Sequence, residues 1–240
     1  MTLHRFFLPL ESITSERVLF PPDQARQISS VLRLRTGDRV IVLDGTGIEY
    51  VVRLTDDGGI VEERRQNRSE PSVTVSLYQG ILKRTRLEMV LQKCTEIGVS
   101  RFVPIHTTRS VPAEPSEPKL RRYQAIVREA AEQSGRGKIP AIGAPMTYRD
   151  ALKDATQRGP VIVPWEEAQG LTLQESALPS AREVGLVIGP EGGFSSEEIE
   201  DARAMGAQVI TLGPRTLRAE TAAIVASGLL LARLEASPSG

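Results

Sequence analysis

The 240-residue chain has a single cysteine, Cys94, and only two histidines, His4 and His106. One thiol excludes an intrachain disulfide framework and fits a reducing compartment, so a cytoplasmic location is expected. No cluster of His and Cys residues has metal-ligand spacing, and the sequence therefore predicts no metal site. Each histidine lies beside residues of a predicted strand and is expected to be packed or at the surface rather than catalytic.

Net charge and long apolar runs are absent as well. Lys and Arg together number 30, as do Asp and Glu, so the formal charge at pH 7 is zero. This balance does not exclude nucleic acid as a partner, because binding depends on a local basic face rather than on the total. No apolar run reaches the length of a membrane span, and the N-terminal "MTLHRFF" lacks the apolar segment of a signal peptide. The sequence thus predicts a soluble intracellular protein.

Residues 1–70 have the pattern of a small β-barrel. Short β-prone pieces, "HRFFL", "RVLF", "DRVIVLDG" and "EYVVRL", are separated by Pro, Gly and Asp turn signals. One helix, "DQARQISSVLRL", is predicted among them, with Ile28, Val31 and Leu32 on one face. The polar stretch 62–72 that follows is interpreted as a linker.

From residue 73 to residue 240 the pattern changes to alternating strands and helices, which favours an α/β domain with a mostly parallel sheet. An early helix carries Leu87, Val90, Leu91 and Cys94 at helical spacing, so Cys94 is predicted to be a core residue rather than a nucleophile. The last helix is apolar nearly all round. Such a helix is either deeply buried or packed against a second subunit.

One strand of this domain ends in an unusual turn, "GLVIGPEGGFSSEEIE". Ser195 and Glu198 form a capping box, which marks the start of a helix immediately after the turn. The run lacks the lysine of a P-loop and the glycine spacing of a dinucleotide fingerprint, and Glu191 would repel a pyrophosphate. The turn therefore either holds a neutral or cationic ligand or is purely structural.

Two other buried strands end in a similar way, one at Pro164 and Trp165 and one at Gly213 and Pro214. Ligands of open α/β sheets bind beyond the carboxyl ends of the strands. If these three strands are neighbours, their ends form one pocket of backbone donors and acceptors with apolar walls. Such a pocket suits an adenine ring and a ribose.

Several longer motifs point to a known family. They are "HRFF", "VLRLRTGD", "EIG", "TTRS", "EAAEQSGR", "IGPEGGFS" and "LGPRTLRAETA". In sequence and order they closely resemble the 16S ribosomal RNA uridine-N3 methyltransferases, a branch of the knotted SPOUT class of S-adenosylmethionine enzymes. The resemblance covers essentially the whole chain, and its first two motifs are similar to that family's PUA-like RNA-binding barrel. The departures are mild, such as isoleucine in "EIG" and threonine in "RTLRAE".

The resemblance implies a trefoil knot in the C-terminal domain, a homodimer, and 16S rRNA, within the 30S subunit, as the partner. It also implies that S-adenosylmethionine, whose sulfonium is cationic, occupies the pocket. The residues expected to bind it are Pro164, Trp165, Ile188, Gly189, Pro190, Glu191, Gly192, Gly193, Leu212, Gly213, Leu217, Arg218, Ala219, Thr221 and Ala222.

Methylation of N3 requires that the N3 proton leave, and Glu220 is the first candidate for the base or for orienting the uracil edge. Alternatively, Glu220 caps the last helix, since acidic residues favour a helix's first turn. Arg218 either stabilises the uridine anion or binds a phosphate, or it pairs with Glu220 and holds the loop. Arg109 either contacts RNA or is a solvated charge at a strand end.

Cationic side chains on both domains are the candidates for contacts with the RNA backbone, which make affinity fall steeply with salt. They are Arg5, Arg33, Arg35, Lys83, Arg84, Arg86, Arg109, Arg121, Arg122 and Arg136. Because a buried methyl group must reach the target base, we expect that base to be extruded from its stack. A methyltransferase for another RNA, or a non-catalytic RNA-binding assembly factor, stays open as an alternative.

Overall fold

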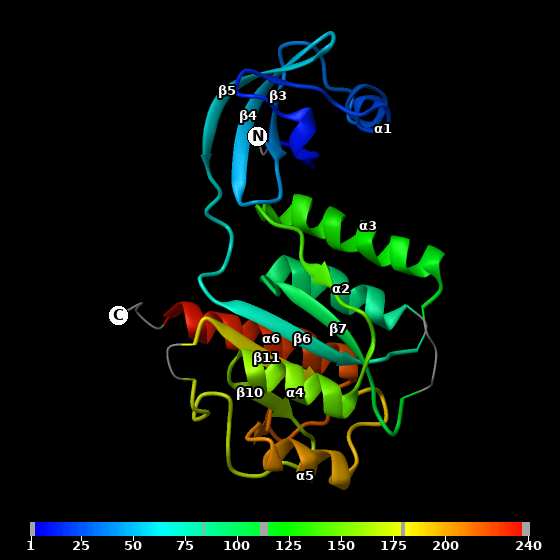
Figure 1. Cartoon of the computed structure of the whole chain (residues 1–240), viewed down its shortest axis with the longest axis vertical. Helices are drawn as coiled ribbons and strands as arrows, with labels where there is room; N and C mark the ends of the chain where they lie inside the picture. Colours follow the sequence, from blue (N-terminus) through cyan, green and yellow to red (C-terminus); the bar gives the residue numbers. More distant parts are fainter. Residues whose placement is uncertain (1–2, 84, 111–114, 179–180, 237–240) are drawn as a thin grey trace. The chain divides into compact units, whose positions relative to one another are not determined.

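The computed structural model describes residues 3–83, 85–110, 115–178 and 181–236. Contacts divide the chain into two compact units. The N-terminal unit consists of residues 1–70 with residues 128–139, and the larger unit consists of residues 71–127 with residues 140–240. Figure 1 shows the elements of both units. No helix within the described ranges is long and apolar enough to cross a membrane.

The N-terminal unit is built on a five-stranded mixed sheet with the order β1-β3-β4-β5-β2. Its strands are β1 (Arg5–Phe7), β2 (Arg17–Val18), β3 (Arg39–Leu43), β4 (Ile48–Thr55) and β5 (Gly58–Gln66). Strand β1 pairs in parallel with β3, and the other pairs are antiparallel. Apolar residues on one face, among them Phe6, Val42 and Val52, form the core of this unit.

Two local predictions for this unit are wrong in part. The supposed linker 62–72 begins inside β5, because its charged residues pair across the ladder, as Arg65 does with Glu49 at 2.6 Å. The predicted helix is a short α1 (Pro22–Arg26) followed by a π-helical turn (Gln27–Val31). The wider π-turn changes the angular spacing, so that Ile28 is buried while Val31 is 71% exposed.

Residues 128–139 hold the end of the first seventy residues in place. Asn67 Nδ2 donates to the Gly135 carbonyl at 2.9 Å, and the Arg136 guanidinium pairs with Glu70 at 2.9 Å. The backbone N–H of Phe7 donates to Glu132 Oε1 at 2.9 Å. The N-terminal unit is therefore discontinuous in sequence.

The larger unit contains a seven-stranded sheet in which all pairings are parallel, as predicted, with the path β12-β10-β11-β6-β7-β8 and β9 paired to β7. Its strands are β6 (Thr74–Gly80), β7 (Arg101–His106), β8 (Ala141–Ile142), β9 (Met146–Thr147), β10 (Val161–Pro164), β11 (Glu183–Ile188) and β12 (Gln208–Ile210). Its helices are α2 (Arg86–Ile97), α3 (Glu117–Ser134, continuing into the N-terminal unit), α4 (Tyr148–Arg158), α5 (Ser196–Ala204) and α6 (Ala219–Ala236).

Two apolar cores, one rich in residues of α2 and α6 and the other in residues of α4 and α5, flank this sheet. Cys94 lies fully buried in the first core, where burial raises the pKa of its thiol to about 12, and it is a core residue as predicted. Helix α6 buries Leu230 and Leu231, but Val225 is 38% exposed and Leu229 is 43% exposed. It is thus mostly, but not entirely, covered within the chain.

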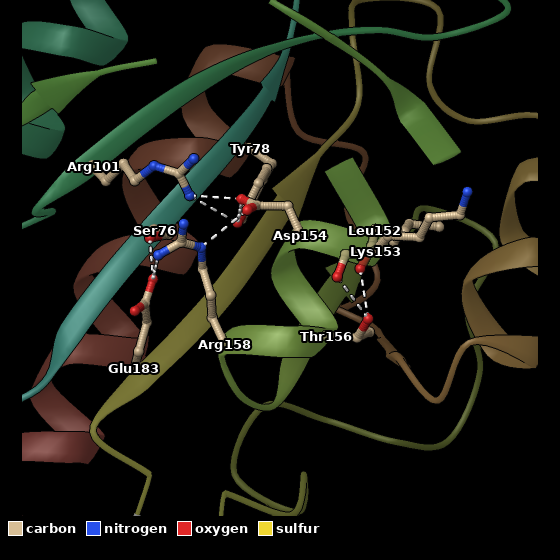
Figure 2. A network of polar contacts seen from close by, with 9 residues as sticks. All are labelled: Ser76, Tyr78, Arg101, Leu152, Lys153, Asp154, Thr156, Arg158 and Glu183. Carbon is tan, nitrogen blue, oxygen red and sulfur yellow. Dashed lines mark hydrogen bonds and ion pairs between the residues drawn. The ribbon is translucent and has the colours of Figure 1, made fainter. Parts of the chain in front are cut away.

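A polar network fastens α4 to the sheet (Figure 2). Asp154 accepts hydrogen bonds from the Tyr78 hydroxyl and from Arg101, each at 2.7 Å, and it pairs with Arg158 at 3.2 Å. Burial raises the pKa of Asp154, but these donors outweigh it and hold the pKa below its usual value. The network is therefore strongest when Asp154 is ionised.

Replacing Asp154 by alanine is expected to lower the free energy of unfolding by about 2 kcal/mol, because the Tyr78 hydroxyl and Arg101 lose their acceptor. Because the folded-state pKa of Asp154 is depressed, this contribution is complete at neutral pH and is lost as the pH falls through that pKa. Urea unfolding at pH 7 and in acid measures it, with Lys153→Ala as a surface control. A difference that stays constant with pH contradicts the assignment.

Candidate active site

The three strands whose ends contain glycine or proline are neighbours. Strands β12, β10 and β11 lie side by side and run parallel, so their carboxyl ends meet at one edge of the sheet. A cavity of about 310 Å³ opens at this edge. The expectation that the three ends share one hollow is confirmed.

Thirteen of the fifteen residues predicted to bind the cofactor line this cavity, and Gly192 and Thr221 do not. The lining residues that sequence reasoning did not assign to the pocket are Arg86, Glu166, Phe194, Arg215 and Thr216. Arg215 and Thr216 lie inside the quoted motif "LGPRTLRAETA", whose continuity is the signal that includes them. Arg86 comes from α2, far away in sequence, and no local pattern connects it to the pocket.

Close backbone packing shapes the turn after β11. Gly80, the last residue of β6, lies so near the turn that an added Cβ would come within 2.5 Å of the Pro190 nitrogen. Gln79 Nε2 donates to the Gly189 carbonyl at 3.2 Å. The predicted capping box is present, with Ser195 and Glu198 each accepting a backbone N–H of the other. The turn is thus fixed on both sides, between the end of β6 and the start of α5.

Glu191 is tied to the protein rather than left free. Its Oε1 accepts from the Lys83 backbone N–H at 2.9 Å and from Arg86 at 3.1 Å. Burial raises the pKa of Glu191, but the Lys83 N–H and the positive charge of Arg86 outweigh burial and leave the pKa below its usual value. The carboxylate therefore anchors the Gly-rich turn to the segment before α2.

The loop carrying "TTRS" is docked against the same turn. Arg109 donates from its guanidinium to the Gly192 carbonyl at 2.8 Å, and the Thr108 N–H donates to Glu198 Oε1 at 2.8 Å. Arg109 is exposed at the surface and also braces the turn.

Glu220 lies in the first turn of α6 and is only 8% exposed. Its Oε1 is 3.9 Å from Arg86 Nε, and its buried Oε2 has no hydrogen-bond partner among the described residues. Within the same residues, Glu220 makes no side-chain cap to the helix backbone and no pair with Arg218. Its neighbours Ala219 and Ala222 line the cavity, but Glu220 is not part of that wall.

Arg215 and Arg218 differ from most arginines of this chain. Both are exposed, both line the cavity, and neither has an ion-pair partner within the described ranges. They lie in the segment between β12 and α6. Two guanidiniums at the cavity rim are therefore available for an anionic ligand.

The remaining candidates for RNA contact differ in their exposure. Arg136 is 2% exposed and holds Glu70, so its guanidinium is not presented at the surface. Arg122 and Arg121 are exposed but pair with Glu88 and Glu117 respectively. Arg33, Arg35 and Lys83 are exposed, and Arg5 is partly buried. Arg84 lies outside the described residues.

Comparisons with known proteins identify the class of protein to which this chain belongs. A family model described as an RNA methyltransferase domain matches residues 69–231, and a model described as an RNA methyltransferase PUA domain matches residues 22–61. Both domains occur in the order predicted from the sequence.

Individual relatives narrow the class further. The chain is 35% identical to ribosomal RNA small subunit methyltransferase E of Synechocystis over 97% of this chain and 78% of the relative. It is 31% identical to the Bacillus subtilis protein of the same name, over 91% and 88%. The crystal structure of the Neisseria gonorrhoeae protein of that name, bound to S-adenosyl methionine, superimposes with a TM-score of 0.88 at 29% identity, covering 97% and 98% of the two chains.

The chain belongs to the ribosomal RNA small subunit methyltransferase E family. The fold class predicted from the sequence, an α/β methyltransferase domain of the SPOUT class with an N-terminal PUA-like domain, is thereby confirmed.

Proposed function

We propose that this protein transfers a methyl group from S-adenosylmethionine to N3 of a uridine in 16S ribosomal RNA. The observation that carries the proposal is the backbone-lined cavity where β10, β11 and β12 end side by side. Membership of the family supports RNA methylation as the general activity. The resemblance of the motifs supports uridine as the target base and N3 as the methylated atom.

The residues of the cavity suit the methyl donor. Ile188, Leu212 and Leu217 provide apolar walls, while Gly189, Gly193 and Gly213 line the cavity without side chains that would cover their backbone. Trp165 also lines the cavity, and its buried Nε1–H has no acceptor within the described part of the chain, as expected where a ligand supplies one. S-adenosylmethionine, when bound, supplies a methyl group activated by a cationic sulfur.

Glu220 and Arg218 are the side chains to which we assign the chemistry. Oε2 of Glu220 is buried and has no partner among the described residues, and we assign it to accept the N3 proton or to orient the uracil edge. A positioned base contributes roughly 10²–10⁴-fold to the rate. Arg218 stabilises the negative charge that develops on the uracil. Its exposed guanidinium has no competing carboxylate among the described residues.

The roles of the two domains, the homodimer and the substrate are proposed from the same resemblance to the family. Residues 1–70 bind RNA and residues 73–240 carry the methyltransferase site. The exposed Val225 and Leu229 of α6 are available to pack against a second copy in a homodimer. The substrate is 16S rRNA within the 30S subunit in the cytoplasm, with the target base extruded from its stack.

The proposal is tested by incubating purified 30S particles lacking the modification, or naked 16S rRNA, with the protein and S-adenosylmethionine. We expect one 3-methyluridine in 16S rRNA, mapped by mass spectrometry of nuclease fragments, and faster modification of the particle than of the naked RNA. Methylation at a carbon or at a ribose hydroxyl contradicts the assigned atom. Methylation of transfer RNA instead contradicts the assigned substrate, and absence of donor binding by calorimetry favours an assembly factor.

A further inference from the structure

We propose that Arg86 is a positioning residue that holds Glu220 and Glu191 in place, rather than a contact to the RNA backbone as its charge alone predicts. The proposal rests on the proposed function, because it concerns the carboxylate assigned to the N3 proton. Arg86 is the first residue of α2, and it lines the cavity.

Arg86 connects three segments that are distant in sequence. Its Nη1 donates to Glu191 Oε1 of the Gly-rich turn at 3.1 Å, and its Nε lies 3.9 Å from Glu220 Oε1 in the first turn of α6. The Lys83 N–H, just before α2, donates to the same Glu191 oxygen at 2.9 Å. One guanidinium thus ties the start of α2 to the Gly-rich turn and to the first turn of α6.

The two carboxylates depend on Arg86 to different degrees. Glu191 keeps the Lys83 N–H as a second donor if Arg86 is removed. For Glu220, Arg86 is the one cation within ion-pair distance among the described residues, and the second carboxylate oxygen has no partner there. The orientation of Glu220 is therefore the property that depends most on Arg86.

The same geometry argues against a contact to phosphate. The Arg86 side chain is 43% exposed, and its Nη1 and Nε face carboxylates whose own side chains are 22% (Glu191) and 11% (Glu220) exposed. A phosphate would have to compete with both carboxylates for the guanidinium. Because partly exposed ion pairs contribute little to stability, removal of Arg86 should leave the fold intact while the position of Glu220 becomes less defined.

The first test is a double-mutant cycle of Arg86→Met and Glu220→Gln, measured as kcat and KM by steady-state methylation with a radiolabelled donor. We expect R86M to lower kcat roughly 10- to 100-fold, as small misplacements of catalytic groups do, with the KM values for RNA and donor changed less than about 3-fold. In the E220Q background R86M should cause little further loss, because the group it positions is already disabled. Arg86→Lys should recover part of the rate.

The matched control is Lys93→Met, which removes another ion pair of α2 with a similarly exposed cation, 45%. This variant should keep the wild-type kcat. Independent losses in the cycle overturn the proposal, as does a raised KM for RNA with a weaker salt dependence in R86M, which is the signature of a phosphate contact.

A second measurement does not need activity. The side-chain carboxyl ¹³C resonance of Glu220, assigned with E220Q, should move in R86M and stay in place in K93M. An unmoved resonance in R86M overturns the proposal. If the wild-type protein methylates no RNA, the proposed function fails, and this resonance alone decides the role of Arg86.

Discussion

Replacing Glu220 by glutamine should lower the rate of uridine methylation about 10²–10⁴-fold while leaving the affinity for S-adenosylmethionine nearly unchanged. Glutamine has almost the same shape, so it fills the same buried site in the first turn of α6. Its neutral amide cannot accept the N3 proton. The donor is held by the strand-end loops, of which Glu220 is not a lining member, so binding and chemistry should separate in this variant.

Single-turnover methylation and calorimetry with the donor measure the two effects. The control is Glu62→Gln, which weakens the ion pairs with Arg39 and Arg53 in the N-terminal unit and should keep the wild-type rate. If E220Q folds normally and turns over like the wild type, Glu220 has no part in proton removal. Its carboxylate would then only stabilise α6 by interacting with the positive end of the helix dipole.

Replacing Gly80 by alanine should weaken S-adenosylmethionine binding roughly 10- to 100-fold. An added Cβ would lie 2.5 Å from the Pro190 nitrogen and 2.8 Å from the Gly189 carbonyl carbon, so the backbone of the turn must move. Forcing extra volume into a packed site costs about 1–3 kcal/mol, and each 1.4 kcal/mol corresponds to about tenfold in affinity. The displaced atoms belong to the cavity wall, so the cost should appear in the dissociation constant.

Calorimetry on purified G80A and on Gly143→Ala distinguishes this effect from a general cost of alanine. The nearest atom to an added Cβ at Gly143 lies at 3.5 Å, an ordinary contact, and Gly143 is not among the cavity residues. G143A should therefore bind the donor like the wild type. Equal affinities for G80A and the wild type would show that the donor does not depend on the shape of this turn.

The sequence predicts the parts of the site that depend on neighbouring residues. The capping box of Ser195 and Glu198 and the strand before the Gly-rich turn are local, and both are present. The motif "LGPRTLRAETA" likewise supplies a continuous stretch of the cavity wall. In each of these features, a few consecutive residues determine the local backbone conformation.

Contacts between distant segments were not predictable in the same way. The burial of Arg136 depends on Glu70, sixty-six residues earlier, and the anchoring of Glu191 depends on Lys83, more than a hundred residues earlier. Helix α4 is not among the helices predicted from the sequence. Its buried face is formed by Tyr148, Ala151, Leu152 and Ala155, and two of these four residues are alanines, which give only a weak apolar pattern. Residues 62–66, the end of β5, were assigned to a linker, since the partners of Glu62 and Arg65 on β3 and β4 are distant in sequence.

The discontinuity of the N-terminal unit has an evolutionary consequence. Residues 135–139 supply the carbonyl that holds Asn67 and the guanidinium that neutralises Glu70, and these groups follow α3 rather than the first seventy residues. A gene fragment ending at residue 70 would leave the Glu70 carboxylate and the Asn67 amide without these partners. A single crossover at residue 70 would therefore separate Asn67 and Glu70 from the groups that hold them.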